Sequence, residues 1–195
     1  MKKAINIFSL LLFTSGFSQV AIGKTSVSNT SVSLEFGSGN RGIILPWVTS
    51  AASVTGAVDG TLIYDIADKK VKYLKSGSWS DLTVDATGVV DTVLQASKVE
   101  LPGAKMVIGT GGASDTTPGI LVLKDTNKAM VLPKVASPHL NIINPSAGMM
   151  VYDTVKHQLA VFNGRYGLSG NLCNVQKVNK YREADSQCFR KNDNN

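Results

Sequence analysis

The sequence predicts an all-β protein with few helices, made of two copies of a small hairpin-containing unit that follow a signal peptide. Three observations support this fold class. Only 17% of the residues are charged, and the abundant Gly, Ser, Thr and Val suit strands and turns better than helices. Four short blocks of sequence recur in the same order along the chain. Apolar residues at a helical spacing of three or four are scarce after residue 18.

The N-terminus has the layout of a secretory signal. Lys2 and Lys3 precede an apolar stretch at residues 4–13, and small and polar residues follow it. Cleavage between Ser18 and Gln19 would start the mature chain at Gln19. The apolar stretch is shorter than the roughly 20 residues of a membrane span, and a buried N-terminal helix is the alternative interpretation.

No later segment is long and apolar enough for a transmembrane helix. We therefore expect a protein that is secreted or lies on the outer cell surface, with the periplasm still open.

The net charge of +6 is not concentrated on the body of the protein. The signal carries +2 and residues 165–195 carry +3, which leaves +1 for everything between them. A nucleic-acid-binding surface needs clustered basic residues on a folded face. We therefore expect no nucleic-acid partner.

An internal repeat organises the remaining chain. The paired blocks are residues 22–23 and 108–109, 40–48 and 127–135, 60–65 and 148–153, and 76–77 and 163–164. Their offsets are 86, 87, 88 and 87 residues. The repeat predicts a signal peptide at 1–18, a first β unit at 19–83, a linker at 84–105, a second β unit at 106–167 and a polar tail at 168–195.

Within the first unit, the short apolar run Ile43–Val48 is interrupted by Pro46, which indicates an edge strand or a bulge. A single helical turn is expected near residues 50–54. Residues 61–64 are an apolar, β-branched stretch, and residues 71–74 follow after a short polar turn. This spacing predicts a β-hairpin.

The second unit repeats the pattern after a linker in which a helical turn is expected at residues 90–95. Strands are predicted at residues 149–152 and 158–162, with a turn at 153–157. The two units are thus expected to have the same architecture.

Four motifs carry a family resemblance. They are the Ile-Gly start at Ile22, the Asn-Arg-Gly-Ile-Ile-Leu-Pro-Trp-Val block at 40–48, the Gly-Thr-Leu-Ile-Tyr-Asp hairpin at 60–65, and an Asn-Gly-x-Trp end, which reads Ser-Gly-Ser-Trp at 76–79. At these residues the chain resembles secreted surface repeat proteins of one phylum of Gram-negative bacteria, and phage tail-fibre segments have a similar shape. The resemblance extends to about Gly164. It implies a surface or extracellular β protein, fibrous or homotrimeric, and brings no catalytic residue with it.

Three threonines stand in a tripeptide similar to an O-glycosylation signal of that phylum. Thr92, Thr116 and Thr154 each follow an aspartate and precede a small or apolar residue. Ordinary turn residues are the alternative interpretation.

The repeat breaks directly after Gly164, where the first unit continues to Trp79. Read in another frame, codons for this region can restore the Gly-x-Trp-Ser pattern, so we hypothesise a frame slip near residues 164–165. A genuine polar tail is the alternative, and resequencing of the gene distinguishes the two. In an exported chain, Cys173 and Cys188 could pair, whereas a frame slip would make both residues artefacts.

The sequence contains no recognisable catalytic or metal-binding pattern. Its histidines, His139 and His157, lack the further ligands and the spacing of a zinc site. The glycine-rich stretch at 109–112 lacks the Gly-Lys-Ser/Thr continuation of a phosphate-binding loop. We expect no cofactor and no enzymatic activity.

Most aromatic side chains are expected in the core of the β units, because they bury the most area. Trp47 is the exception, since Lys134 stands at the matching place in the second unit. The sequence therefore predicts a structural or interaction protein of the surface, part of a fibre or adhesive assembly that self-associates to cover strand edges. The alternative is a carbohydrate-binding adhesin in which Trp47 contacts a surface glycan or protein.

Overall fold

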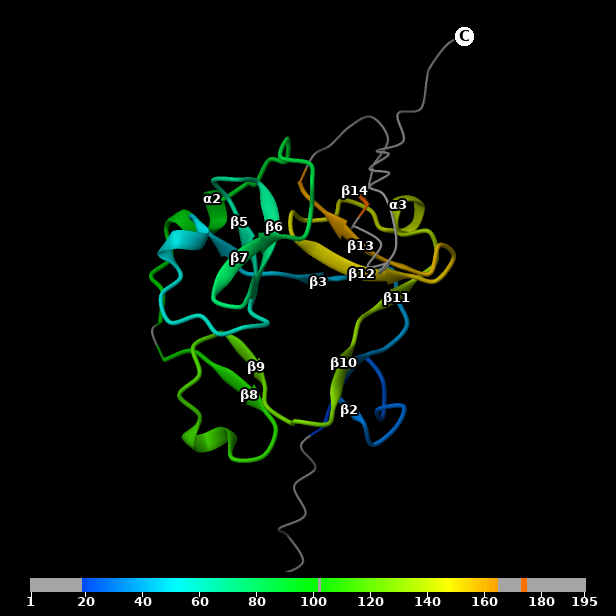
Figure 1. The fold of residues 1–195 in the computed structure, drawn as a ribbon. Coiled ribbons are helices and arrows are strands. Elements are labelled where there is room, and N and C mark those ends of the chain that lie inside the picture. Colours follow the sequence, from blue (N-terminus) through cyan, green and yellow to red (C-terminus); the bar gives the residue numbers. More distant parts are fainter. Residues whose placement is uncertain (1–18, 102, 165–172, 175–195) are drawn as a thin grey trace, which may run out of the picture.

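The computed structural model describes residues 19–101, 103–164 and 173–174. The fold is β-rich, as predicted (Figure 1). The described helices are single turns: α2 (Val93–Ala96), α3 (Pro138–Asn141) and the 3₁₀ turns η1 (Ala51–Ser53) and η2 (Gly112–Ser114). Among these residues, no helix is both long and apolar enough to cross a bilayer.

Seven short strands lie in the described residues of the first half of the chain. They are β1 (Val20–Ile22), β2 (Val32–Phe36), β3 (Ile43–Ile44), β4 (Trp47–Val48), β5 (Leu62–Asp65), β6 (Lys70–Lys75) and β7 (Ser78–Asp81). β3 and β4 are separated at Leu45 and Pro46, because proline cannot donate a ladder hydrogen bond. The predicted interruption at Pro46 is thus confirmed.

Seven further strands lie in the part of the second half that the structure describes. They are β8 (Met106–Ile108), β9 (Leu121–Leu123), β10 (Ala129–Val131), β11 (Lys134–Val135), β12 (Met149–Asp153), β13 (Gln158–Phe162) and β14 (Cys173–Asn174). Both predicted hairpins are confirmed, because β5 pairs antiparallel with β6 and β12 pairs antiparallel with β13.

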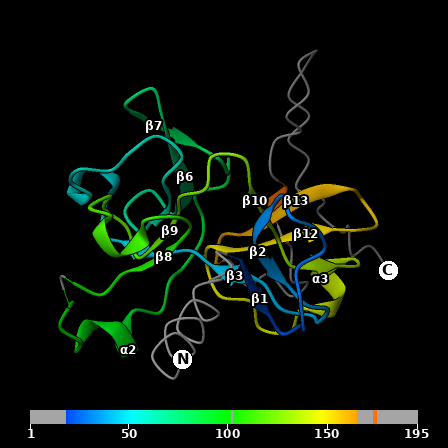
Figure 2. The ribbon, with the colours of Figure 1, turned by 90° about the horizontal axis from the view of Figure 1, so that it is seen from below.

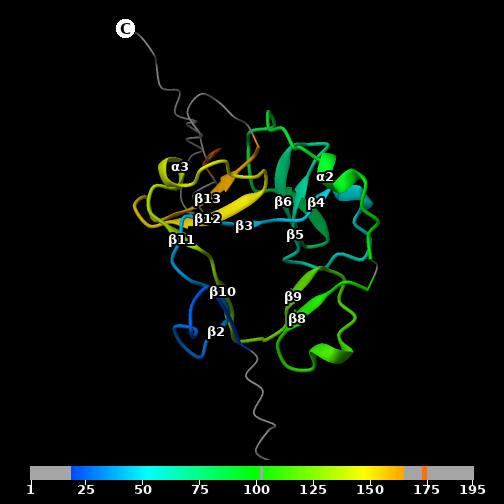
Figure 3. The same cartoon turned by 180° about the vertical axis from the view of Figure 1, so that it is seen from behind.

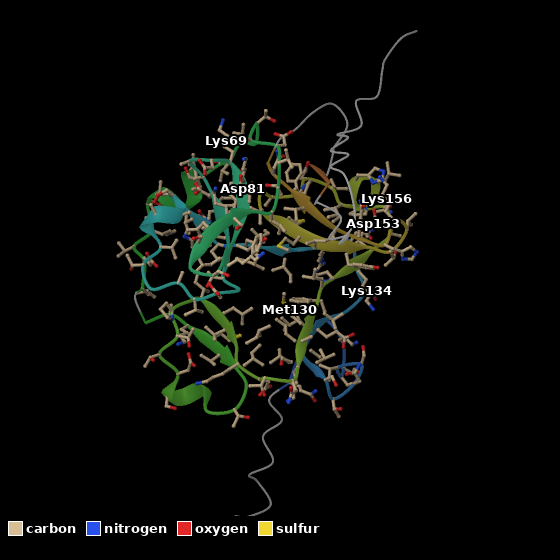
Figure 4. All side chains as sticks on the ribbon, viewed as in Figure 1. Lys69, Asp81, Met130, Lys134, Asp153 and Lys156 are labelled. Atoms are coloured by element: carbon tan, nitrogen blue, oxygen red, sulfur yellow. The ribbon has the colours of Figure 1, made fainter. Side chains whose placement is uncertain are left out.

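The hairpin turns place a non-glycine residue in the left-handed region at the same point. Lys69 has φ 57° and His157 has φ 53°, and the two are 88 residues apart, as the surrounding hairpin residues are. Figure 4 shows Lys69 and Lys156 at the outer ends of the two hairpins.

Pairing between strands repeats with the same register in the two halves. β4 and β5 pair parallel with Trp47 opposite Tyr64, and β11 and β12 pair parallel with Lys134 opposite Tyr152. β1–β2 and β8–β9 are also parallel pairs, with matching registers at Val20–Leu34 and Met106–Leu121.

The two halves are interlocked by strands that pair across them. β10 of the second half pairs parallel with β2 of the first, and β3 of the first half pairs antiparallel with β12 of the second. Figures 1 and 3 show β1, β2, β8, β9 and β10 together at one end of the molecule, away from the two hairpins. Seen from below in Figure 2, β8 and β9 lie on the opposite side from β1 and β2. The domain boundaries predicted from the sequence stay a prediction.

The main core also draws on both halves. Its buried members are Leu45, Tyr64, Val71, Ala147, Met150 and Val161. A smaller cluster in the second half contains Val135, Ile142, Val151 and Ala160. The halves therefore share the apolar surface that stabilises them.

Glu35 on β2 anchors the loop between β1 and β2. Its carboxylate accepts hydrogen bonds from the backbone and hydroxyl of Ser28 and lies 2.7 Å from the Lys24 ammonium. The bond from Lys24 and those from Ser28 lower the pKa of Glu35 from 4.5 to about 2.

Acid should therefore weaken this anchor in a defined pH window. A carboxylate with a lowered pKa stabilises the folded state above its unfolded pKa, and that contribution is lost as the pH falls from 4.5 towards about 2. Glu35→Gln should flatten the acid decline of the urea midpoint in this window. An unchanged decline would show that other carboxylates dominate it.

Candidate assembly surface

Three hydrogen bonds join the first half of the chain to one short segment of the second. The Tyr64 hydroxyl donates to the Asn163 carbonyl at 2.6 Å, and the Trp47 indole N–H donates to the Ala147 carbonyl at 2.7 Å. The Leu45 N–H donates to the Gly148 carbonyl at 3.1 Å. Each donor lies on or beside a strand of the first half, so these bonds fix the first half against residues 147–163.

Tyr64 is the central residue of this junction. Its side chain is 0% exposed, and burial, followed by the nearby charges of Asp65 and Asp85, raises the pKa of its hydroxyl to about 12. A neutral phenol at physiological pH keeps its proton to donate to Asn163. The group is thus a structural donor.

Trp47, predicted to contact a ligand, is half-buried and packs against the main core. Lys134, its counterpart on β11, is exposed, and Figure 4 shows it at the edge of the molecule. The indole N–H is engaged by Ala147, so only the remaining part of the ring is free for a ligand.

Trp47→Phe tests the structural role of this indole. The variant keeps an aromatic ring but removes the donor, leaving the Ala147 carbonyl without that bond. We expect a loss of about 1 kcal/mol in the free energy of unfolding, the typical net value of one hydrogen bond. Chemical denaturation measures it, with Lys134→Met at the matching exposed position as a control that should change stability little.

The three candidate glycosylation sites share one local geometry. In each, the backbone N–H two residues after the aspartate donates to that aspartate's carboxylate, from Val93 to Asp91, from Thr117 to Asp115 and from Val155 to Asp153. These are Asx turns, which such residues form without any modification. Thr116 is exposed, whereas Thr92 and Thr154 are half-buried. Glycosylation of these threonines stays a prediction.

Charged side chains near the first hairpin neutralise one another. The Lys72 ammonium lies 2.7 Å from both Asp68 and Asp81, and Lys70 also pairs with Asp81. Burial alone would lower the pKa of Lys72, but the two carboxylates outweigh it and raise that pKa. Figure 4 shows Asp81 on this side of the molecule. The cluster is a set of matched ion pairs on a strand surface.

A second ion cluster ties the loop between β8 and β9. Asp115 has a side chain only 2% exposed and pairs with Lys105 at 2.8 Å and Lys124 at 2.6 Å. These bonds hold the pKa of Asp115 well below its usual range. In the part of the chain that the structure describes, no three His, Cys, Asp or Glu side chains gather as a metal site would require.

Many large apolar side chains are exposed. The most open are Val99 (89%), Ile143 (84%), Val93 (76%), Leu140 (74%) and Leu101 (72%). Other exposed apolar side chains lie at residues 84–89 and in or beside β8 and β9: Val84, Val89, Met106, Ile120 and Leu121. Single exposed apolar residues are ordinary, but among the described residues they are concentrated along residues 84–121.

This second half is also where the chain is similar to known proteins. Residues 108–171 match a family described as a phage tail like trimerisation region. The match spans β9 to β13 and includes the second hairpin. No curated protein and no solved structure matches the chain. The family match and the repeated strand pairing fit a β-repeat of the tail-fibre kind.

Several sequence predictions fall on residues outside the described ones. These are the signal peptide at 1–18 with Ser18, most of the tail after Gly164, and Cys188. Gln19 is described and donates from its side-chain amide to the Val32 carbonyl. The backbone of Cys173 pairs opposite Val161, and in the first half Tyr73, the equivalent of Val161, pairs opposite Ser80. The pairing of Cys173 with Cys188 and the frame slip near residues 164–165 stay hypotheses from the sequence.

Proposed function

We propose that this chain is a non-enzymatic structural module of the bacterial surface that assembles as a homotrimer within a fibre or adhesive assembly. The observation that carries the proposal is the match of residues 108–171 to a phage tail like trimerisation region. The repeated β architecture and the exposed apolar side chains support it, because an assembly would cover surface that one chain leaves open.

The secretory signal predicted from residues 1–18 motivates the proposed location, which is the outer cell surface or the medium. Immunogold labelling of intact producing cells with an antibody against the mature chain tests it. We expect label on extended surface structures or on shed fibres. Label confined to the cell interior, with an intact outer surface that carries none, would contradict a surface role.

Adhesion to a surface glycan or protein is the finer part of the proposal. One observation at Trp47 supports adhesion. Part of its ring is exposed, and the second unit has the solvent-exposed Lys134 at the matching position. A glycan array compares the native chain with Trp47→Ala and with Trp47→Phe. Binding that is lost in the first variant and kept in the second would support a stacking contact. Absence of binding to any glycan would remove this part of the proposal.

A further inference from the structure

β2 and β9 are equivalent strands, yet they are paired differently. β2 has β1 on one edge and β10 on the other, whereas β9 pairs only with β8 among the described residues. The edge of β9 that corresponds to the β10-binding edge of β2 is therefore not paired with any strand that the structure describes.

β12 and β5 show the same difference. One edge of β12 pairs with β13, and the other pairs with β3 at Met149 and Met150 and then with β11. One edge of β5 pairs with β6, but β4 covers only Tyr64 and Asp65 on the other.

The uncovered part of β5 is centred on Leu62. The Tyr64 N–H donates to Pro46 on the β4 side, and backbone groups two residues apart point to the same edge of a strand. The backbone N–H and C=O of Leu62 therefore point to the β4 side of β5. On the corresponding side of β12, its counterpart Met150 is paired with Ile43 of β3.

The strands that would complete these edges are β3 for β9 and β10 for β5, and each lies in the other half of the chain. β3 and β10 are equivalent strands, 87 residues apart. The paired edge of β3 is the one that includes Leu45, whose backbone N–H donates to the Gly148 carbonyl. The paired edge of β10 is the one that includes Ala129, whose backbone N–H donates to the Ser31 carbonyl. Ala129 corresponds to Gly42 in the repeat, so the two strands use opposite edges. Within the described part of the chain, each strand leaves unpaired the edge that the other has paired.

One chain thus carries two pairs of complementary free edges. If another repeat followed, β10 would pair antiparallel with the β5 strand of that repeat. Met130 would lie opposite Leu62 and Val131 opposite Thr61, as β3 pairs with β12. β3 would add parallel to a β9, with Ile43 opposite Leu121 and Ile44 opposite Val122, as β10 adds to β2.

Within one chain these strands do not meet. Figures 1 and 3 show β5 and β10 in different parts of the molecule. The free edges also carry exposed apolar side chains, with Ile44 at 48% and Leu121 at 43%. Unpaired, apolar edges are templates for another strand, and proteins normally protect them.

We propose that a second copy of this chain fills these edges, so that the second half of one copy docks on the first half of the next. The contact is head-to-tail, since β10 of one copy meets β5 of its neighbour and β9 meets β3. Head-to-tail contacts give rings when the rotation closes, and three copies close the ring. This inference rests on the proposed homotrimer and names its interface.

Paired cysteines test the register directly. Leu45 and Gly148 are hydrogen-bonded, so the neighbouring pair Ile44–Met149 is non-hydrogen-bonded, with Cα atoms about 4.5 Å apart. That separation suits a disulfide, which needs about 4.4 to 6.8 Å. The proposed contact places Thr61 and Val131 at the equivalent positions in two copies.

The test variant is Thr61→Cys with Val131→Cys in the full chain, with Cys173→Ser and Cys188→Ser to remove other thiols. Oxidation should convert most of the protein into covalent trimers on a non-reducing gel. The matched control, Ile44→Cys with Met149→Cys in the same background, should close a disulfide within one chain and migrate as a monomer. It shows that a cross-strand pair of this geometry oxidises.

Mixing two single-cysteine variants tests the head-to-tail arrangement. Thr61→Cys and Val131→Cys, unfolded and refolded together, should give covalent dimers that neither variant gives alone. Dimers of either single variant would overturn the proposed register, and so would a Thr61–Val131 disulfide within one chain. A trimeric mass without cross-linking would overturn this interface and leave the proposed trimer standing. A monomeric mass would overturn both.

Discussion

Tyr64→Ala should lower the free energy of unfolding by about 4 kcal/mol, the range for a fully buried aromatic residue. The side chain is 0% exposed, and its hydroxyl is bonded to the Asn163 carbonyl. Its removal opens a cavity in the core shared by the two halves. Urea unfolding measures the loss, with Tyr152→Ala at the equivalent, half-buried position as the control. Equal losses in the two variants would contradict a central role for Tyr64.

Tyr64→Phe separates the hydrogen bond from the packing. We expect it to cost about 1 to 3 kcal/mol, because the buried Asn163 carbonyl loses a partner. It should also change the alkaline limb of stability. The folded pKa of about 12 lies above the usual 10.0, so the native contribution is complete below 10.0 and is lost as the pH rises towards 12. In the Phe variant this part of the alkaline decline should disappear.

Gly88→Ala should destabilise the chain by at least about 2 kcal/mol, as expected for overpacking against a backbone atom. A Cβ on Gly88 would lie 1.8 Å from the Asn163 carbonyl oxygen and 2.9 Å from the Tyr64 hydroxyl. The segment after the first hairpin would have to lift away from the second half, where Val89 also bonds to Gly164.

Gly103→Ala is the matched control in the same predicted linker. A Cβ there would meet nothing within 4 Å, and the residue is exposed. The substitution should change the free energy of unfolding by no more than about 0.5 kcal/mol. If both glycine variants behaved alike, the close contact between Gly88 and the second half would not exist in solution.

The sequence was most informative where local chemistry decides the structure. Pro46 splits β3 from β4 because it lacks an N–H, and the polar residues between Asp65 and Lys70 form a hairpin turn. The constant repeat offset predicted hairpins at the same place in both halves, as found.

Long-range pairing could not be predicted in this way. Nothing local to Ile43 shows that it pairs with Met150 rather than with a strand of its own half. β2 alternates apolar and polar residues from Val32 to Phe36 and could have been predicted. β1, β8 and β9 have only three residues each, too few for a clear alternating pattern, and α3 is a single turn set by Ser137 and Pro138. The environment of Trp47 likewise depends on Ala147, 100 residues away.

A homotrimer would explain the repeat, the unpaired strand edges and the exposed apolar side chains together. The repeat supplies equivalent strands, and the halves of one chain satisfy some of their edges. The edges left over match one another in direction and register. The exposed apolar residues of the 84–121 segment and the match to a trimerisation region at 108–171 point to the same conclusion.

The most direct test of this account is the mass of the mature chain in solution, from Gln19 onward, measured by light scattering over a range of concentrations. The measurement should be made with the printed tail and with the tail read in the other frame. A homotrimer has a mass three times that of one chain, and we expect this mass to be independent of concentration once the trimer is assembled. A monomeric mass for both forms would contradict it.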